Sequence, residues 1–295
     1  MQIEFLKIMK KITFSLIAAV IFCNNNAAFS GSMGTVSPEP NWTGIYLGAN
    51  SGYWKSQANN VVTTGSPRFI NQTFDLGANN IVNALTQMAT NTFSLKADGF
   101  IGGGQIGYNY QYNRRFLMGL DINLDGLSNA NNTFALQKVV SLADFNEEYV
   151  GSLAVKQRIN YLGTVRARVG YLYRPTFLVY GTGGFAYGNV TLDTAWTANE
   201  SLEPTVYPPV FAQNSLSKTC TGWTIGGGVE WLFKPNWSTK IEYVYYDLST
   251  INAHALLSQV NMAETSPALW GSVMANTALP ISVGTIKIGI SYHFS

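Results

Sequence analysis

The sequence predicts an all-β protein that crosses a membrane as an antiparallel up-and-down β-barrel of eight strands. Three observations predict this fold class. Only 12% of the 295 residues are charged, whereas about a quarter are charged in ordinary soluble domains. Apolar and polar residues alternate with a period of two along several segments, as they do on the two faces of a strand. Long polar connections and short turns also follow one another in alternation along the chain.

Composition and charge exclude three other classes of protein. The chain is 46% hydrophobic and 13% aromatic, which is incompatible with intrinsic disorder. Its formal net charge of +2 is too weak for a basic nucleic-acid-binding surface. After residue 30, no segment approaches the roughly 20 uninterrupted apolar residues that a transmembrane helix needs. A membrane β-barrel and a soluble β-sandwich remain.

The first 30 residues have the three-part organisation of a secretory signal peptide. A basic stretch from Lys7 to Lys11 precedes an apolar run over 12–23, and the small residues Ala28 and Ser30 follow it at the two positions that signal peptidase recognises. The apolar run is about twelve residues long, which is too short to span a bilayer as a helix. We therefore expect an exported protein whose first 30 residues are removed.

This cleavage divides the chain into three predicted parts and changes its charge. The parts are a signal peptide over 1–30, a periplasmic N-terminal segment over 31–41 and an outer-membrane β-barrel domain over 42–295. Without the signal peptide, the chain has 15 basic and 15 acidic residues. Its net charge is then zero, so the apparent basicity comes from the signal peptide. Cys220 becomes the only cysteine, which excludes an intramolecular disulfide.

Six segments alternate clearly and two glycine-rich segments do so less clearly, which makes eight predicted strands. Between Arg115 and Leu127, for example, apolar residues alternate with polar ones that include Asp121 and Asp125. The apolar faces of the six clear segments carry no Lys, Arg or Glu, as lipid-facing surfaces require. The eight segments are 42–54, 100–110, 115–127, 155–173, 177–190, 221–233, 239–245 and 286–294.

The connections between these segments fall into two classes. Three are tight turns by composition, at 111–114, 174–176 and 234–236. Four are long and rich in Asn, Ser, Thr and Ala, and they cover 55–97, 128–154, 191–219 and 251–281. Outer-membrane barrels have short periplasmic turns and long extracellular loops, with both termini in the periplasm.

Aromatic residues are placed as two interfacial belts. The strand ends beside the short turns carry Tyr108, Tyr110, Phe116, Tyr171, Tyr173, Phe177, Trp231, Phe233, Trp237, Tyr292 and Phe294. The opposite ends carry Tyr53, Phe100, Tyr187, Trp223 and Tyr245. Tyr and Trp concentrate at the two membrane–water interfaces, whereas a soluble sandwich has no reason to place them at both ends of its strands. The pattern favours the membrane barrel.

Four segments resemble a known family. Asn41–Asn50, Tyr161–Tyr171, Thr182–Gly188 and Gly289–Phe294 are similar to strands of the small outer-membrane surface-antigen barrels, the immunogenic-protein and opacity-like group. The resemblance covers the strands and hardly touches the loops. It implies an eight-stranded, surface-exposed barrel in the bacterial outer membrane. It also implies a C-terminal assembly signal for the barrel-insertion machinery, formed by Ile286, Ile288, Ile290, Tyr292 and Phe294.

Ten charged side chains are predicted to point into the lumen. They are Asp121, Asp125, Lys156, Arg158, Arg166, Arg168, Glu230, Lys240, Glu242 and Lys287. The interior of an eight-stranded barrel is only just filled by side chains, so these charges must pair with one another or with trapped water. One interpretation is a structural ion-pair network, which the geometry favours. The other is a narrow path for small solutes, which the excess of six basic over four acidic residues would make weakly anion-selective.

Two motifs that suggest chemistry have simpler explanations. The segment Gly102–Gly107 fits the pattern G-x-G-x-x-G, but a dinucleotide site needs a helix directly after it, and here a strand continues. His254 lies in a long loop near Ser258, with Asp247 as the nearest carboxylate in the sequence, and nothing positions a third catalytic partner. We therefore expect neither an enzyme nor a cofactor or metal site.

Specific function is expected in the long loops. Ile81, Val82, Leu85 and Met88 have helical spacing and predict a short amphipathic helix over the barrel mouth, and Leu256, Leu257, Val260 and Met262 are faintly helical as well. Pro204, Pro208 and Pro209 restrict the third loop. We expect an envelope protein that binds through its loops, as an adhesin or surface antigen does; the alternative is a narrow porin-like channel. Expected partners are outer-membrane lipid and lipopolysaccharide, the insertion machinery, and a host or envelope ligand, with no nucleic acid.

Overall fold

The computed structural model describes residues 41–70, 75–128, 133–142, 147–200, 209–261 and 268–294. The predicted signal peptide and residues 31–40 of the N-terminal segment lie outside these ranges. The described elements are β1 (Gly44–Ile70), α2 (Asp75–Ala89), β2 (Asn91–Gln111), β3 (Phe116–Leu127), β4 (Thr133–Leu142), β5 (Glu147–Arg174), β6 (Phe177–Glu200), β7 (Val210–Lys234), β8 (Trp237–Asn261) and β9 (Ala268–Phe294).

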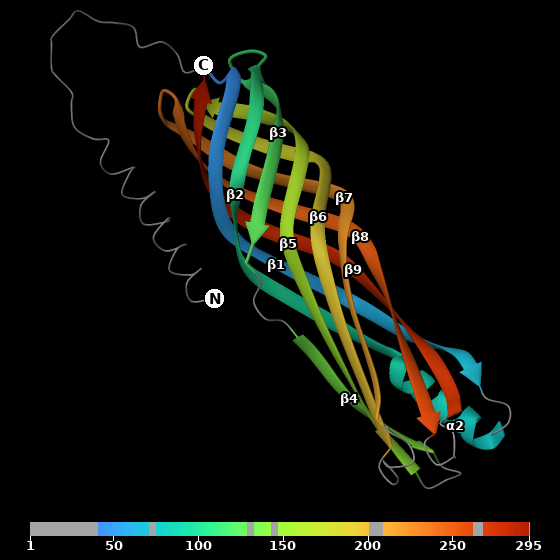
Figure 1. The fold of residues 1–295 in the computed structure, drawn as a ribbon. Helices are drawn as coiled ribbons and strands as arrows, with labels where there is room; N and C mark the ends of the chain where they lie inside the picture. Colours follow the sequence, from blue (N-terminus) through green and yellow to red (C-terminus); the bar gives the residue numbers. More distant parts are fainter. Residues whose placement is uncertain are drawn as a thin grey trace, which may run out of the picture. The chain divides into compact units, whose positions relative to one another are not determined.

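The strands form a closed antiparallel ring with eight positions (Figure 1). Except for β3 and β4, each strand pairs with the next strand in the chain, and β1 closes the ring by pairing with β9. The strands β3 and β4 share one position, because both pair with β5: β3 with its residues 161–171 and β4 with its residues 147–156. The predicted all-β barrel is thereby confirmed, with one of the eight strands split in two.

The three short turns lie at one end of the ring, as predicted. They join β2 to β3, β5 to β6 and β7 to β8. In the first, the Asn113 side-chain oxygen accepts hydrogen bonds from the backbone N–H groups of Arg115 and Phe116. Such an Asx-type contact replaces a backbone hydrogen bond that the turn cannot make.

The four long connections are mostly β-strand, which differs from the loops that the sequence predicts. Six of the strands have 24 to 28 residues, whereas about 10 tilted residues suffice to cross a bilayer. The rest of each long strand extends beyond the membrane on the side opposite the short turns. The polar composition suggested irregular loops because the alternation there uses Ala, Ser, Thr and Asn. These residues differ less in hydropathy than Ile and Asp do, so the alternation is harder to recognise.

Beyond the membrane, the ring separates into two four-stranded sheets. One sheet is β2–β1–β9–β8 and the other is β4–β5–β6–β7. The pairing of β7 with β8 ends at Gly222 and Leu248, and no pairing joins β2 to β4 within the described part of the chain. We call this part the two-sheet module; its described residues fall within 55–98, 133–160, 189–221 and 249–284.

The helix α2 confirms one of two predicted helices, but it does not lie over the barrel mouth as predicted: it packs near Gly65 of β1 and Gly271 of β9, at the end of the module farthest from the barrel (Figure 1). Ile81, Val82 and Leu85 are buried and belong to the core cluster that joins the two sheets. The prediction of a second helix around Leu256 is wrong, because that segment is part of β8 and pairs with β9. Leu256 is exposed and Leu257 is buried, which is the alternation of a strand. Met262, Pro204 and Pro208 lie outside the described residues.

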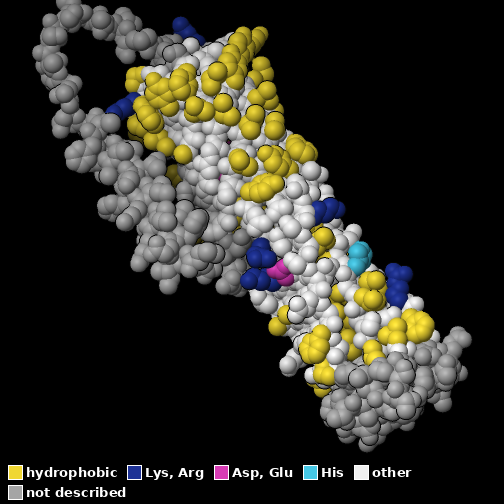
Figure 2. Space-filling model, in the orientation of Figure 1, with side chains coloured by type: hydrophobic (Ala, Val, Ile, Leu, Met, Phe, Trp, Pro, Cys, Tyr) yellow, Lys and Arg dark blue, Asp and Glu magenta, His cyan; other side chains and the backbone are white. Residues whose placement is uncertain are grey.

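The barrel and the module have opposite polarity. In β9, every second residue points inward; these residues are mostly apolar from Val273 to Val283 and mostly polar from Thr285 to His293. The outward-facing residues change in the opposite sense, from a mixed set in the module to apolar side chains in the barrel. Ile286, in the barrel, is 57% exposed. Figure 2 shows the outward hydrophobic side chains gathered over the end that carries the short turns. This band is the lipid-facing surface.

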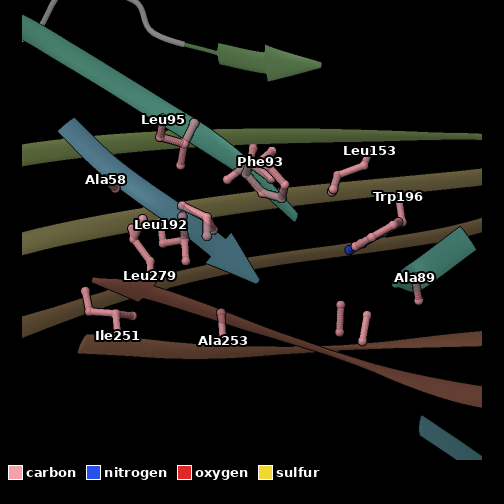
Figure 3. Close-up of a cluster of buried hydrophobic side chains, with 14 of the residues drawn as sticks. Ala58, Ala89, Phe93, Leu95, Leu153, Leu192, Trp196, Ile251, Ala253 and Leu279 are labelled. Atoms are coloured by element: carbon pink, nitrogen blue, oxygen red, sulfur yellow. The ribbon is translucent and has the colours of Figure 1, made fainter. Parts of the chain in front are cut away.

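The module has its own hydrophobic core (Figure 3). Leu153 and Trp196 from one sheet face Ile251 and Leu279 from the other, and all four are at most 3% exposed. The edge between β2 and β4 is covered by side chains: Phe93 and Phe134 stack with ring centroids 4.3 Å apart. The module is therefore a packed domain-like structure and not a set of loops.

Candidate functional site

Eight of the ten predicted lumen residues lie buried inside the barrel, and Arg166 is at their centre. Its guanidinium donates to Asp121 at 2.9 Å and to Glu242 at 3.1 Å. These three side chains come from β5, β3 and β8 and are at most 1% exposed. A buried ion pair is tolerated only when both charges are compensated, and Arg166 compensates two carboxylates at once.

A second group lies nearer the short turns, around Glu230. Arg168 pairs with one oxygen of Glu230, while the Ser238 hydroxyl donates to the other. The Arg168 guanidinium also stacks on the Tyr180 ring, 3.7 Å from its centroid, which is a favourable cation–π contact. His293 lies within 3.3 Å of Glu230, inside the lumen as the alternation predicts.

A third group lies toward the module. Lys287 donates to Asp125 at 2.9 Å and contacts the Tyr246 hydroxyl at 3.4 Å. Lys240 belongs between the first two groups: it lies opposite Glu230 in the register of β7 and β8, donates to the side-chain oxygen of Gln105 and lies 3.7 Å from Glu242. The three groups together form a layer of paired charges across the interior.

The prediction that Lys156 and Arg158 also point inward is wrong. The register between β5 and β6 shifts between Ile159 and Tyr161, so the strand exposes opposite faces on the two sides of this bulge. Arg158 is exposed, whereas Ile159, which the period-two pattern assigned to the lipid face, is fully buried. A bulge adds one residue and reverses the alternation.

Correcting these two residues changes the electrostatics of the lumen. The eight that remain are four basic and four acidic side chains, and each acidic one has a basic partner. The excess of positive charge that suggested a weak preference for anions is therefore absent from the described interior.

Apolar clusters lie on both sides of the charged layer. On the side of the short turns, Trp42, Leu117, Leu172, Leu178, Tyr180 and Leu232 pack together. The indole N–H of Trp42 donates to the Pro175 carbonyl at 2.9 Å, which fixes the ring across the barrel end. On the other side lies the core of the module. An apolar seal at each end opposes passage of ions.

Sequence reasoning missed a polar cluster on the outside of the module. The Asp193 carboxylate accepts from Arg158 at 2.8 Å and from the Ser215 hydroxyl at 2.6 Å. Asn160 donates to Asn189, which in turn donates to Ser217 at 3.2 Å. Only the bulge brings these side chains onto one face, and a bulge leaves no clear signal in the sequence.

The residues considered for catalysis do not form a constellation. His254 and Ser258 are four residues apart on β8, which separates them by about 13 Å along a strand. The His254 ring contacts Asn276 at 2.6 Å. Among the described residues, no group of three His, Cys, Asp or Glu side chains could hold a metal ion.

The G-x-G-x-x-G segment lies within β2, where it precedes no helix. Two of its glycines, Gly103 and Gly107, allow neighbouring strands to pack closely. A Cβ atom at Gly103 would lie 2.1 Å from the Leu124 carbonyl oxygen on the neighbouring strand, so that position requires glycine.

The residues of the predicted assembly signal alternate with inward residues along β9. Ile286, Ile288 and Phe294 are each more than half exposed on the lipid-facing side, and Tyr292 packs against Trp237 and Phe294. Their role in assembly remains a proposal.

Comparison with known proteins agrees with this architecture. The family described as "Outer membrane protein beta-barrel domain" matches residues 14–294. The 31 kDa outer-membrane immunogenic protein of Brucella melitensis is 28% identical over 283 residues, which are 96% of this chain and 94% of that protein. The 22 kDa outer membrane protein of Rhizobium leguminosarum is 36% identical over 103 residues, 35% of this chain and 40% of that protein.

Among the solved structures that match is that of Ail, the attachment invasion locus protein of Yersinia pestis. It is 14% identical, with a TM-score of 0.34, and the match covers 85% of this chain and 99% of Ail. Within the described residues, the structure has no helix that is both long and apolar enough to cross a membrane. The family match, the relatives and the β-barrel with its lipid-facing band lead to one conclusion: the chain belongs to the outer-membrane β-barrel domain family and is a protein of the bacterial outer membrane.

Proposed function

We propose that the protein is a non-enzymatic surface protein in which the barrel is an anchor and the two-sheet module binds a host or envelope ligand. The observation that carries the proposal is the core of the module. An anchor needs no structure beyond the membrane, yet here two sheets and α2 enclose a large apolar cluster outside it. A packed support of this kind holds its connecting segments in place for binding.

The interior of the barrel argues against the alternative of a narrow channel. Its charges are paired, and apolar clusters lie on both sides of them. An open aqueous path would leave at least one of these layers hydrated. We therefore expect no discrete conductance steps when the refolded protein is inserted into a planar lipid bilayer; regular steps would favour the channel.

The binding role is tested with a minimal barrel that lacks the module. Two-residue Asn-Gly turns replace the chain beyond four cross-strand pairs: Ser56 and Ala97, Gly126 and Tyr161, Gly188 and Cys220, and Leu248 and Ile281. Removing both sheets together leaves neither half of the apolar core exposed.

Beads coated with vesicles of either protein are applied to epithelial cells and to extracellular matrix. We expect the minimal barrel to fold, which a difference in gel mobility between boiled and unboiled samples reports, and to lose adhesion. Unchanged adhesion by a folded minimal barrel contradicts the proposal. Separately, purified full-length protein is expected to leave lipid and peptide substrates intact; cleavage of either would support an enzyme.

The remaining partners follow from the location. Outer-membrane lipid and lipopolysaccharide surround the barrel, and the insertion machinery would recognise the last strand through the residues that end at Phe294.

A further inference from the structure

A polar cluster lies on the outer face of β5, β6 and β7, just beyond the membrane. We call it the β5–β7 cluster; its members are Lys156, Arg158, Asn160, Asn189, Thr191, Asp193, Ser215 and Ser217. Arg158 and Asp193 have side chains that are 44% and 32% exposed. Cross-strand register places Lys156 opposite Asp193 and Arg158 opposite Thr191.

The level of the cluster is fixed by the outer aromatic residues. Tyr161 and Tyr187 lie next to each other on β5 and β6, with ring centroids 6.4 Å apart. Arg158 is three residues beyond Tyr161, which corresponds to about 10 Å along the strand and less along the membrane normal because barrel strands are tilted. The polar layer outside the hydrocarbon is about 5–8 Å deep. Arg158 therefore lies at the headgroup level of the outer leaflet, and Lys156, two residues farther along β5, lies just beyond it.

The cluster reaches this surface because of the bulge. Regular alternation would place both basic residues inside the barrel, where the charged layer is already balanced. The register shift between Ile159 and Tyr161 directs them outward at the point where β5 leaves the membrane. Bulges commonly redirect side chains at functional positions.

The chemistry of the cluster is cationic and rich in hydrogen-bonding groups. Lys156 and Arg158 face one carboxylate, Asp193, so one positive charge of the cluster is unbalanced. The ion pair engages only the Nη2 atom of Arg158, which leaves further guanidinium donors directed elsewhere. The amides and hydroxyls around it form a connected network across three strands.

We infer that the β5–β7 cluster is a binding site for the phosphorylated saccharide headgroup of lipopolysaccharide. Lys156 and Arg158 pair with a phosphate, and the amide and hydroxyl groups bind the adjoining sugars. The lipid reaches the site laterally from the outer leaflet, so the acyl chains lie along the aromatic and aliphatic band below. The inference rests on the outer-membrane location and not on adhesion by the module, so either can fail without the other.

A simpler role for the same residues is to clasp β5 to β6. The two roles differ in what Asp193 does. In a clasp, Arg158 and Asp193 are equivalent partners, and removing either weakens the structure. In a phosphate site, Asp193 competes with the ligand for Arg158, so its removal strengthens binding.

The experiment measures lipopolysaccharide retained by the refolded protein in phosphatidylcholine nanodiscs that contain an increasing fraction of lipopolysaccharide. Each basic residue near an anionic lipid surface strengthens binding roughly fivefold. We therefore expect Lys156→Gln with Arg158→Gln to weaken retention by at least tenfold, Arg158→Lys to preserve most of it, and Asp193→Asn to increase it. The matched control is Arg174→Gln with Lys234→Gln, which removes the same charge at the exposed short turns and leaves retention unchanged.

Two further measurements identify the ligand and verify that the variants are folded. Delipidated phosphorylated core oligosaccharide should compete with the lipid for the wild-type site, whereas inorganic phosphate alone competes weakly. Gel mobility of unboiled samples verifies that each variant is folded. Equal retention by the wild type and the Lys156/Arg158 double variant overturns the inference, as does reduced retention by Asp193→Asn. Loss of the same size in the control pair shows a nonspecific charge effect and also overturns it.

Discussion

The barrel and the two-sheet module are built from the same strands and are stabilised in opposite ways. In the barrel, the inside is polar and paired and the outside is apolar; in the module, the inside is apolar and the outside is polar. The same strands continue through both regions, and only the surroundings differ. Lipid favours apolar side chains on the outside of the barrel, and water on the outside of the module drives apolar side chains inward.

The comparison teaches that each region should respond to a different kind of substitution. Loss of a charge should damage the barrel, where an unpaired partner is left in a low-dielectric interior. Loss of apolar volume should damage the module, where burial provides the stability. Three variants test this difference, in order of decreasing expected effect.

The largest effect is expected for Arg166→Met in the barrel. It leaves Asp121 buried without its partner and weakens the compensation of Glu242, which costs roughly 3–5 kcal/mol. Urea unfolding in lipid vesicles, followed by gel mobility, measures the loss. The double variant Arg166→Met with Asp121→Asn removes one charge of each sign and should recover much of it. Wild-type stability in Arg166→Met would break the comparison, because the layer would then be dispensable.

A smaller and local effect is expected for Leu85→Ala in α2. Leu85 is fully buried between the helix and the sheets, and truncation of a buried Leu costs about 3 kcal/mol. Limited proteolysis should show faster cleavage within the module, while the barrel keeps its unboiled gel mobility. The control Asn83→Ala changes an exposed position of the same helix and should have no effect. Equal loss of barrel stability would mean that the two regions unfold as one unit.

The smallest effect is expected for Lys138→Met on β4. The Lys138 ammonium donates to the Gln87 and Thr90 carbonyls at the C-terminal end of α2, where a positive charge complements the helix dipole. Loss of these bonds costs about 1 kcal/mol. Faster amide hydrogen exchange near the end of α2 measures it, and Lys138→Arg should behave like the wild type. No change in exchange would show that the Lys138 contacts do not stabilise the end of α2.

The sequence predicted the barrel region well because lipid imposes a strong difference in hydropathy between the two faces of each strand. A lipid-facing position tolerates no charge, so segments such as 115–127 alternate clearly between apolar residues and Asp or Asn. The three turns were recognisable from Pro, Asn and Arg because turn-forming residues are also a local signal. The helix α2 was also predicted, because Ile81, Val82, Leu85 and Met88 share one helical face.

The module and the β5–β7 cluster were missed for two physical reasons. Water-exposed strands accept Ala, Ser and Thr on either face. The difference in hydropathy between the two faces, which reveals a strand in a sequence, is therefore small in residues 251–281. The bulge before Tyr161 inserts one residue into the pairing with β6, and no residue type marks it. The same bulge moved Lys156 and Arg158 from the predicted lumen to the outer surface.

The sequence by itself determined that the chain forms an eight-position barrel in a membrane, because the period of two and the exclusion of charge from one face are properties of single strands. Only the tertiary structure decided which charges meet inside the barrel, where the polarity reverses and which basic residues reach the outside. Those features depend on the register between strands, and register is set by the packing of all eight positions together.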